Sequence, residues 1–117
     1  MTKIYGIKNC DTMKKARAWL EQQQLPYQFI DYRTDGLSAE QLAHFAAKCG
    51  WQNLLNTRGT TYRELADSDK ADLTEQKALA LMLAQPAMIK RPLLEHNGQY
   101  TLGFSITTYQ HVFGLSA

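Results

Sequence analysis

The sequence predicts an α/β protein with a mixed four-stranded sheet, flanked by helices and interrupted by a helical insertion. Strand-like apolar runs enclose a helical pattern in the first third of the chain, the middle third is helical, and the last third holds a hairpin before a short helix. The chain of 117 residues has the length of one domain and can bury a core without disulfides. We therefore predict a single domain over residues 1–117, with the helical insertion at about residues 37–85.

The N-terminal part has the pattern of strand, helix and strand. Residues 4–7 are strand-like, and a helix is expected from about residue 12 to residue 24, with Pro26 as its stop signal. Residues 27–32 alternate aromatic or apolar with polar side chains, which is typical of a strand. Two strands joined by one helix predict a right-handed βαβ unit with parallel strands.

The middle of the chain is predicted to be helical. One helix begins at the capping box of residues 38–41. Residues 51–55 fit a short helical turn or a tucked loop, and residues 56–61 are polar and expected to form an exposed loop. A further helix has its caps within residues 72–75 and ends before Pro86, and the apolar residues on several of its sides predict that it is largely buried.

The C-terminal part is predicted to be a hairpin followed by a helix. Residues 93–96 and 99–102 form its strands around an Asn97-Gly98 turn. Residues 105–113 fit a short helix capped by a hydroxyl side chain. The order βαβ, helices, ββα is that of a thioredoxin-like fold with a helical insertion.

Composition excludes several classes of protein. The net charge of +2 is too small to indicate direct binding of nucleic acid. No secretory segment or membrane span is recognisable, so we expect a cytoplasmic protein, without a membrane partner and monomeric. Cys10 and Cys49 form no CxxC pair and no cluster with histidine, so both are expected to be free thiols and no metal site is predicted.

Cys10 is the candidate for chemistry because it lies between a strand and a helix. Unpaired N–H groups and the dipole at a helix N-terminus favour the thiolate, which is the reactive form of cysteine. The basic residues Lys8, Lys14, Lys15 and Arg17 act in the same direction. The alternative is that Cys10 is a small buried hydrophobic residue, and spacing alone leaves both interpretations open.

Three segments carry a family resemblance. Residues 5–16 (YGIKNCDTMKKA), 54–60 (LLNTRGT) and 85–94 (QPAMIKRPLL) resemble the arsenate reductase (ArsC)/Spx family, and most of all its small YffB-type branch. The segments occur in the family's order and span nearly the whole chain. The resemblance implies a thioredoxin-like fold.

The resemblance also implies the roles of individual residues. Cys10 corresponds to the nucleophile and Arg58 and Arg91 to active-site arginines, while Arg91-Pro92 is expected to hold a cis peptide bond beside the cysteine. Arginine presents a planar fork of donors that suits an oxyanion or a carboxylate. The further residues predicted to line the site for substrate or glutathione are Lys8, Asn9, Asp11, Thr12, Lys14 and Pro92.

The sequence departs from the family pattern at three places. Gly6 stands where arsenate reductases of this type carry a histidine, and Met13 stands where relatives carry serine or a second cysteine. No arginine follows Arg91. Arsenate reduction therefore ranks last among the functions considered, and a resolving thiol is expected to come from glutathione.

We predict a glutathione-dependent thiol oxidoreductase that uses a single nucleophilic cysteine, with no bound cofactor. Cys10 would attack a disulfide or an oxyanion, and glutathione would resolve the adduct. The alternative is a non-catalytic Spx-like module that binds RNA polymerase or another protein partner. Without the resemblance, Arg58 would be interpreted as an ordinary solvated charge. Cys49 is expected to be a structural residue, because no basic cluster or strand-to-helix turn surrounds it.

Overall fold

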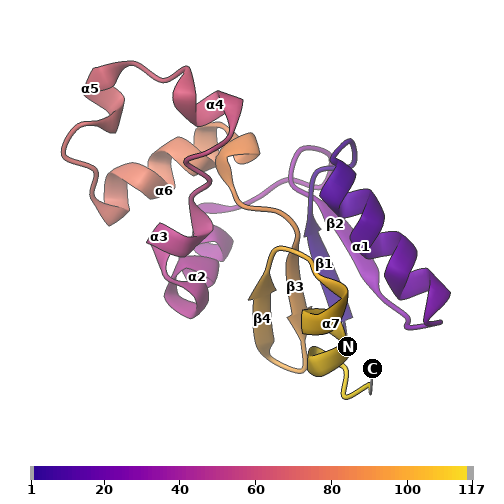
Figure 1. The fold of residues 1–117 in the computed structure, drawn as a ribbon. Coiled ribbons are helices and arrows are strands. Elements are labelled where there is room, and N and C mark those ends of the chain that lie inside the picture. The colour runs from indigo at the N-terminus through magenta and orange to yellow at the C-terminus, as the bar shows by residue number, and fades with distance from the viewer. Residues whose placement is uncertain (1, 116–117) are drawn as a thin grey trace. The chain divides into compact units, whose positions relative to one another are not determined.

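The computed structural model describes residues 2–115, which divide into two compact units (Figure 1). The sheet unit holds the chain up to Asp35 and from Arg91 onward, and the helical unit holds Gly36–Lys90. The helical unit thus contains all of the stretch predicted as an insertion. Within residues 2–115, no helix is both long enough and apolar enough to cross a membrane.

The sheet unit is built on a four-stranded sheet with the strand order β2-β1-β3-β4. Strands β1 and β2 are parallel, and the pairs β1–β3 and β3–β4 are antiparallel. This arrangement confirms the predicted mixed sheet with a βαβ and a ββα half. The elements of the unit are β1 (Thr2–Gly6), α1 (Asp11–Gln22), β2 (Gln28–Asp31), β3 (Leu93–His96), β4 (Gln99–Leu102) and α7 (Ile106–Val112).

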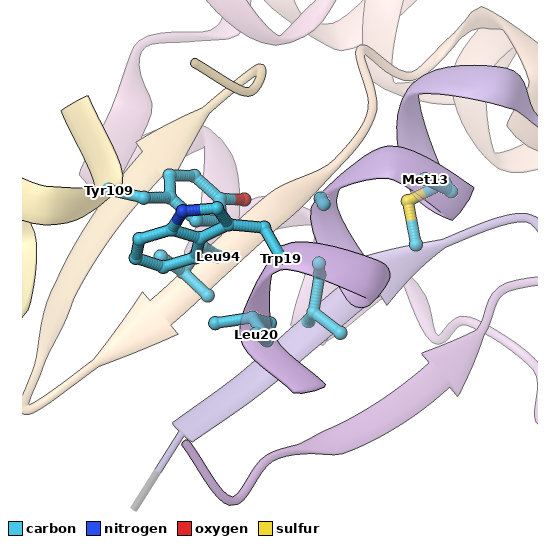
Figure 2. Close-up of a cluster of buried hydrophobic side chains, with 7 residues drawn as sticks. Met13, Trp19, Leu20, Leu94 and Tyr109 are labelled. Atoms are coloured by element: carbon cyan, nitrogen blue, oxygen red, sulfur yellow. The ribbon is translucent and has the colours of Figure 1, made fainter. Parts of the chain in front are cut away.

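A core of apolar side chains joins α1 and α7 to one face of this sheet. Ile4 on β1 pairs with Leu94 on β3, so the two side chains lie side by side on the same face. Figure 2 shows the α1 side chains and Tyr109 of α7 gathered over that face. The buried members of the cluster are Ile4, Met13, Ala16, Trp19, Leu20, Leu94 and Tyr109.

The C-terminal half of the unit follows the predicted turn and cap. Asn97 and Gly98 have φ values of 50° and 81°, as a hairpin turn with two left-handed residues requires. Ser105 begins α7, and its hydroxyl accepts a hydrogen bond from Thr108 N at 3.1 Å. The predicted hairpin and the hydroxyl cap are both confirmed.

The helical unit forms its own core. Ser38 and Thr74 begin its two longer helices, and their side chains accept hydrogen bonds from Gln41 N (3.0 Å) and Lys77 N (3.2 Å). The elements are α2 (Ala39–Cys49), α3 (Trp51–Leu54), α4 (Thr60–Arg63), α5 (Asp67–Lys70), α6 (Glu75–Ala84) and a 3₁₀ helix, η1 (Pro86–Met88). Its largest fully buried side chains are Phe45, Leu42, Leu54, Met82, Met88 and Ile89.

The structure corrects the predictions in three places. Helix α1 ends at Gln22, before the predicted residue 24. The single-turn helices α4 and α5 were not expected. Lys77 Nζ of α6 donates to Ser68 O in α5 (2.8 Å) and to Ala71 O directly after it (2.7 Å). Helix α6 is buried on one side only: Leu83 keeps 38% of its surface exposed.

Candidate functional site

Cys10 lies at the junction of β1 and α1, as the sequence predicts. Strand β1 ends at Gly6, a short loop follows, and Cys10 is the N-cap residue of α1 with extended backbone (φ −129°). Its carbonyl accepts the first helical hydrogen bond from Lys14 N at 3.0 Å. The side chain is half-buried against the core of the sheet unit, so the sulfur is both anchored and accessible.

The surroundings of Cys10 favour its thiolate. Burial raises the pKa of the thiol, because it removes water from the charged form. The N–H group of Met13, the side chain and charge of Arg91, and the N–H group of Thr12 act in the opposite direction and leave the pKa below its ordinary value. These donors therefore discriminate in favour of the ionised sulfur.

Arg91 and Pro92 belong to the same unit as Cys10. The Arg91-Pro92 peptide bond is cis, which confirms the expectation from the family resemblance. Pro92 is buried, and its carbonyl accepts a hydrogen bond from Gly103 N at 2.9 Å, which ties this turn to the end of β4. Arg91 is half-buried and reaches the Cys10 sulfur, so the structure brings these two predicted site residues together.

The other predicted residues of the Cys10 turn are mostly at the surface. Lys8, Asn9, Asp11 and Lys14 are exposed, and Thr12 is half-buried. Of these five, only Thr12 acts on the thiol, and it does so through its backbone.

Arg17 was expected to help the lysines favour the thiolate, and the structure assigns it to different partners. Its Nε donates to Tyr27 Oη at 3.2 Å, and its guanidinium lies 4.1 Å from the centre of the Phe29 ring. A guanidinium over an aromatic ring is a favourable cation–π contact. Arg91, from a distant part of the chain, supplies the positive charge at the sulfur instead.

Arg58 lies in the helical unit. It follows α3 in an exposed turn, where its N–H donates to Asn56 Oδ1 at 3.2 Å. Asn56 N in turn donates to Met88 O at 2.8 Å, and Leu55 forms a β-bridge with Ile89. The segment that carries Arg58 is thus fixed at its base to the segment of residues 88–89, while the Arg58 side chain remains exposed.

Gly6 and Met13, the two departures from the family pattern beside Cys10, are in contact with each other. A Cβ atom at Gly6 would overlap the Met13 thioether and lie 2.9 Å from its Cε. Met13 is fully buried, and Figure 2 shows its side chain directed from α1 towards β1. The space above residue 6 is therefore filled by the side chain of residue 13, a pairing that the sequence reasoning missed.

Asp31 was also missed. It is the last residue of β2, its side chain is only 7% exposed, and its Oδ2 accepts a hydrogen bond from Lys8 N at 3.1 Å. The signal in the sequence was an aspartate at the end of a predicted strand, followed by turn residues. An aspartate in that setting often bonds the backbone of the turn after it.

Neither cysteine is paired, as expected: Cys10 and Cys49 are both free thiols. The part of the chain that the structure describes, residues 2–115, holds no group of three or more His, Cys, Asp or Glu side chains suited to a metal ion.

Comparison with known proteins identifies the relatives of this chain. A family model described as "ArsC family" matches residues 5–112. The structure of a protein named YffB (PA3664) is 50% identical, with a TM-score of 0.90, and the match covers 95% of this chain and 97% of that one. The solution structure of an arsenate reductase (ArsC) related protein from Brucella melitensis is 48% identical, with a TM-score of 0.80, over 97% of this chain and 95% of that one. These likenesses confirm the predicted thioredoxin-like fold.

A regulatory protein is also among the relatives. The global transcriptional regulator Spx 1 of Lactococcus lactis is 27% identical over 107 residues, which are 90% of this chain and 83% of the regulator.

Proposed function

The chain belongs to the ArsC family, and on that basis we propose that it is a glutathione-dependent thiol oxidoreductase with one nucleophilic cysteine. The observation that carries this proposal is the environment of Cys10. Its thiolate is favoured by the N–H groups at the start of α1 and by Arg91, and a thiolate is the form that attacks disulfides.

The proposed reaction has two exchange steps. In the first, the Cys10 thiolate attacks the glutathione sulfur of a mixed disulfide; a Cys10–glutathione disulfide forms, the substrate S–S bond breaks, and the substrate thiolate leaves and takes up a proton. In the second, a glutathione thiolate attacks the glutathione sulfur of that adduct, which releases glutathione disulfide and regenerates the Cys10 thiolate. Overall, the substrate thiol is released in its reduced form and one glutathione thiol is oxidised, because it joins the glutathione unit of the mixed disulfide in glutathione disulfide.

We propose an external resolving thiol because the turn that carries Cys10 holds no second cysteine. The position that carries a second cysteine in the redox-sensing relatives is Met13, whose side chain is buried against Gly6. Glutathione fits the need, since it is the abundant thiol of the reducing cytoplasm, where we propose that the protein works.

Arginine side chains would hold the carboxylates of glutathione. Arg91 is suited to this because it already reaches the sulfur, and a guanidinium can bind a carboxylate through two donors. We extend the same role to Arg58 on the strength of the family resemblance of residues 54–60. Asn9 and the exposed Lys8 and Lys14 would complete the contacts of the Cys10 turn with an anionic substrate.

The decisive experiment is a titration of the Cys10 thiolate, followed by its absorbance or by its alkylation rate, with and without glutathione. We expect a pKa below about 8.5 and protection of Cys10 from alkylation by glutathione analogues. The reduction of a glutathione mixed disulfide should be lost in Cys10→Ser. An ordinary thiol pKa, together with unchanged turnover in Cys10→Ser, would overturn the proposal.

A second candidate is a regulatory module, which is favoured by the likeness to the transcriptional regulator Spx 1. In that role Cys10 would sense oxidants and the protein would bind RNA polymerase or another protein partner. Stoichiometric binding of purified polymerase, without turnover of any mixed disulfide, would favour this function. Reduction of arsenate or another oxyanion ranks below both, because Gly6 and Met13 place no polar side chain at the positions used by the arsenate reductases of this type.

A further inference from the structure

Asp31 is a buried charged residue that the proposed reaction does not use. Its side chain is 7% exposed, and it lies at the end of β2 opposite Gly6, the last residue of β1. A carboxylate so placed is costly unless hydrogen bonds compensate its lost hydration. The strands β1 and β2 are parallel, so the chain leaves both of them at the same edge of the sheet, beside the turn that carries Cys10.

The hydrogen bonds of Asp31 divide between two loops. Its Oδ1 accepts from Arg33 N (2.8 Å) and Thr34 N (3.3 Å), in the turn that follows β2. Its Oδ2 accepts from Lys8 N (3.1 Å), in the loop that leads to Cys10. Burial raises the pKa of this carboxyl, but the three N–H donors and the charge of Arg33 outweigh burial and leave the pKa below its ordinary value. Asp31 is therefore ionised at neutral pH.

The loop between β1 and Cys10 is held at two successive points. Gly6 O accepts a hydrogen bond from Tyr32 N at 2.8 Å, and Lys8 N donates to Asp31. Both bonds come from the end of β2, and they bracket Ile7, which is itself buried. Cys10 follows two residues after Lys8.

We propose that Asp31 is a positioning residue for the Cys10 thiolate: its carboxylate holds Lys8 N and so keeps the sulfur in reach of the α1 N–H groups and Arg91. The inference rests on the proposed role of Cys10 as nucleophile, but not on glutathione as its partner. Asp31 acts through the backbone of the loop and touches no reacting atom.

If Asp31 acted on Cys10 only through its charge, its removal would change the pKa of Cys10 in the direction opposite to that expected for a positioning role. A negative charge near a thiol disfavours the thiolate, so removal of the charge alone lowers the pKa of Cys10. Loss of the attachment at Lys8 instead moves the sulfur away from its donors and raises that pKa. The direction of the change in a charge-neutral variant therefore distinguishes positioning from electrostatics.

The test compares Asp31→Asn with Asp35→Asn. In Asp31→Asn the amide oxygen can still accept from the turn after β2, while the amide NH₂ group meets the N–H of Lys8, and the attachment is lost. Asp35→Asn removes an equal charge from the same turn, and its amide oxygen can still accept from Asp31 N, which donates to Asp35 Oδ2 at 2.8 Å. In Asp31→Asn we expect the pKa of Cys10 to rise and its alkylation at pH 7 to slow by about three- to tenfold.

In Asp35→Asn the alkylation rate should stay unchanged or increase slightly. Equal rates in the two variants, or a lower Cys10 pKa in Asp31→Asn, would overturn the proposal. A second measurement needs only the native protein, in case Asp31→Asn does not fold. By NMR, the Lys8 amide should exchange slowly with solvent, and its chemical shift should follow the titration of Asp31 at acidic pH; an unprotected Lys8 amide would contradict the proposal.

These readouts are independent of the proposed substrate. Alkylation of Cys10 requires no glutathione, so a protein without glutathione turnover but with a slowed Asp31→Asn variant would disprove the function and retain the role of Asp31. Normal glutathione turnover, with the same Cys10 pKa in Asp31→Asn and Asp35→Asn, would support the proposed function and disprove the positioning role of Asp31.

Discussion

Of the two cysteines, one lies at the start of a helix and the other at the end of a different helix, and the pKa values of their thiols are shifted in opposite directions. Cys10 precedes the first turn of α1, while Cys49 is the last residue of α2. Both are half-buried, and burial raises the pKa of each. The pKa of Cys49 stays above its ordinary value, whereas N–H groups and Arg91 bring that of Cys10 below it.

This difference shows that burial alone does not decide whether a thiol is reactive. A helix start presents free N–H groups, and a helix end presents free carbonyls. At the end of α2, Asn53 Nδ2 donates to Cys49 O at 2.8 Å, so the local polar group satisfies the backbone and not the sulfur. The surroundings therefore favour the thiolate of Cys10 in the sheet unit and disfavour that of Cys49 in the helical unit.

The largest expected effect is on turnover, when replacement of Cys10 is compared with replacement of Cys49. Cys10→Ser should reduce turnover of a glutathione mixed disulfide on the order of a thousandfold or more, because the attacking sulfur is gone. Cys49→Ser should stay within about twofold of the native rate, since its thiol has no stabilising donors. Steady-state kinetics with purified variants measure both. Equal losses would mean that the two thiols act together.

Next in size is the effect of packing beneath the Cys10 turn. Gly6→Ala drives a methyl group into the Met13 side chain and should lower the free energy of unfolding by about 1–3 kcal/mol. Urea denaturation measures this change. If the overlap is the cause, Gly6→Ala should cost clearly less in a Met13→Ala background than alone. Additive losses would show that the two sites are not coupled.

The charge of Arg91 should have a smaller effect, confined to one cysteine. Arg91→Ala removes an opposite charge and a donor, so the pKa of Cys10 should rise and its alkylation at pH 7 should slow by roughly three- to tenfold. Arg91→Lys keeps the positive charge, so the pKa of Cys10 should rise less than in Arg91→Ala. Cys49 is an internal control: mass spectrometry of both alkylated sites should show its rate unchanged. A parallel change at Cys49 would point to partial unfolding.

The smallest effect is on the pH dependence of stability. The pKa of Cys10 is lowered on folding, so its thiolate stabilises the native state above the unfolded pKa of about 8.5, and this contribution is lost as pH falls through the folded pKa. For Cys49, whose pKa is raised, stability is lost as pH rises. Between pH 6 and pH 9.5, the melting temperature of the native protein relative to Cys10→Ser should therefore increase, and relative to Cys49→Ser decrease. Changes of less than about 4 °C are expected, and shifts of the same sign for both would contradict this account.

Local patterns in the sequence predicted most of the fold. The caps Ser38, Thr74 and Ser105 lie within the capping box and the cap segments that were predicted, because a cap depends on a few neighbouring residues. The Asn97-Gly98 turn is equally local. Helix α5, a single turn of four residues, was not predicted; its Ser68 carbonyl accepts a hydrogen bond from the Lys77 side chain of α6.

Within the candidate site, the position of Cys10 was predicted from the chain itself and its neighbour Arg91 from the family resemblance, whereas other contacts between elements were missed. Cys10 was identified from its place between a strand and a helix. The expected help from Arg17 was wrong, since that side chain packs over Phe29. The contact between Gly6 and Met13 joins a strand to a helix through a glycine, which has no side chain and hence no periodicity to detect.

The contact between Gly6 and Met13 also limits how this protein can vary over evolution. A side chain gained at residue 6, such as the histidine of the arsenate reductases, would overlap the Met13 side chain, which would have to move or become smaller. A cysteine gained at residue 13 would leave a cavity above Gly6, which a side chain at residue 6 could fill. Residues 6 and 13 should therefore change together among close relatives. Relatives with a second cysteine at residue 13 should also differ from this chain at residue 6.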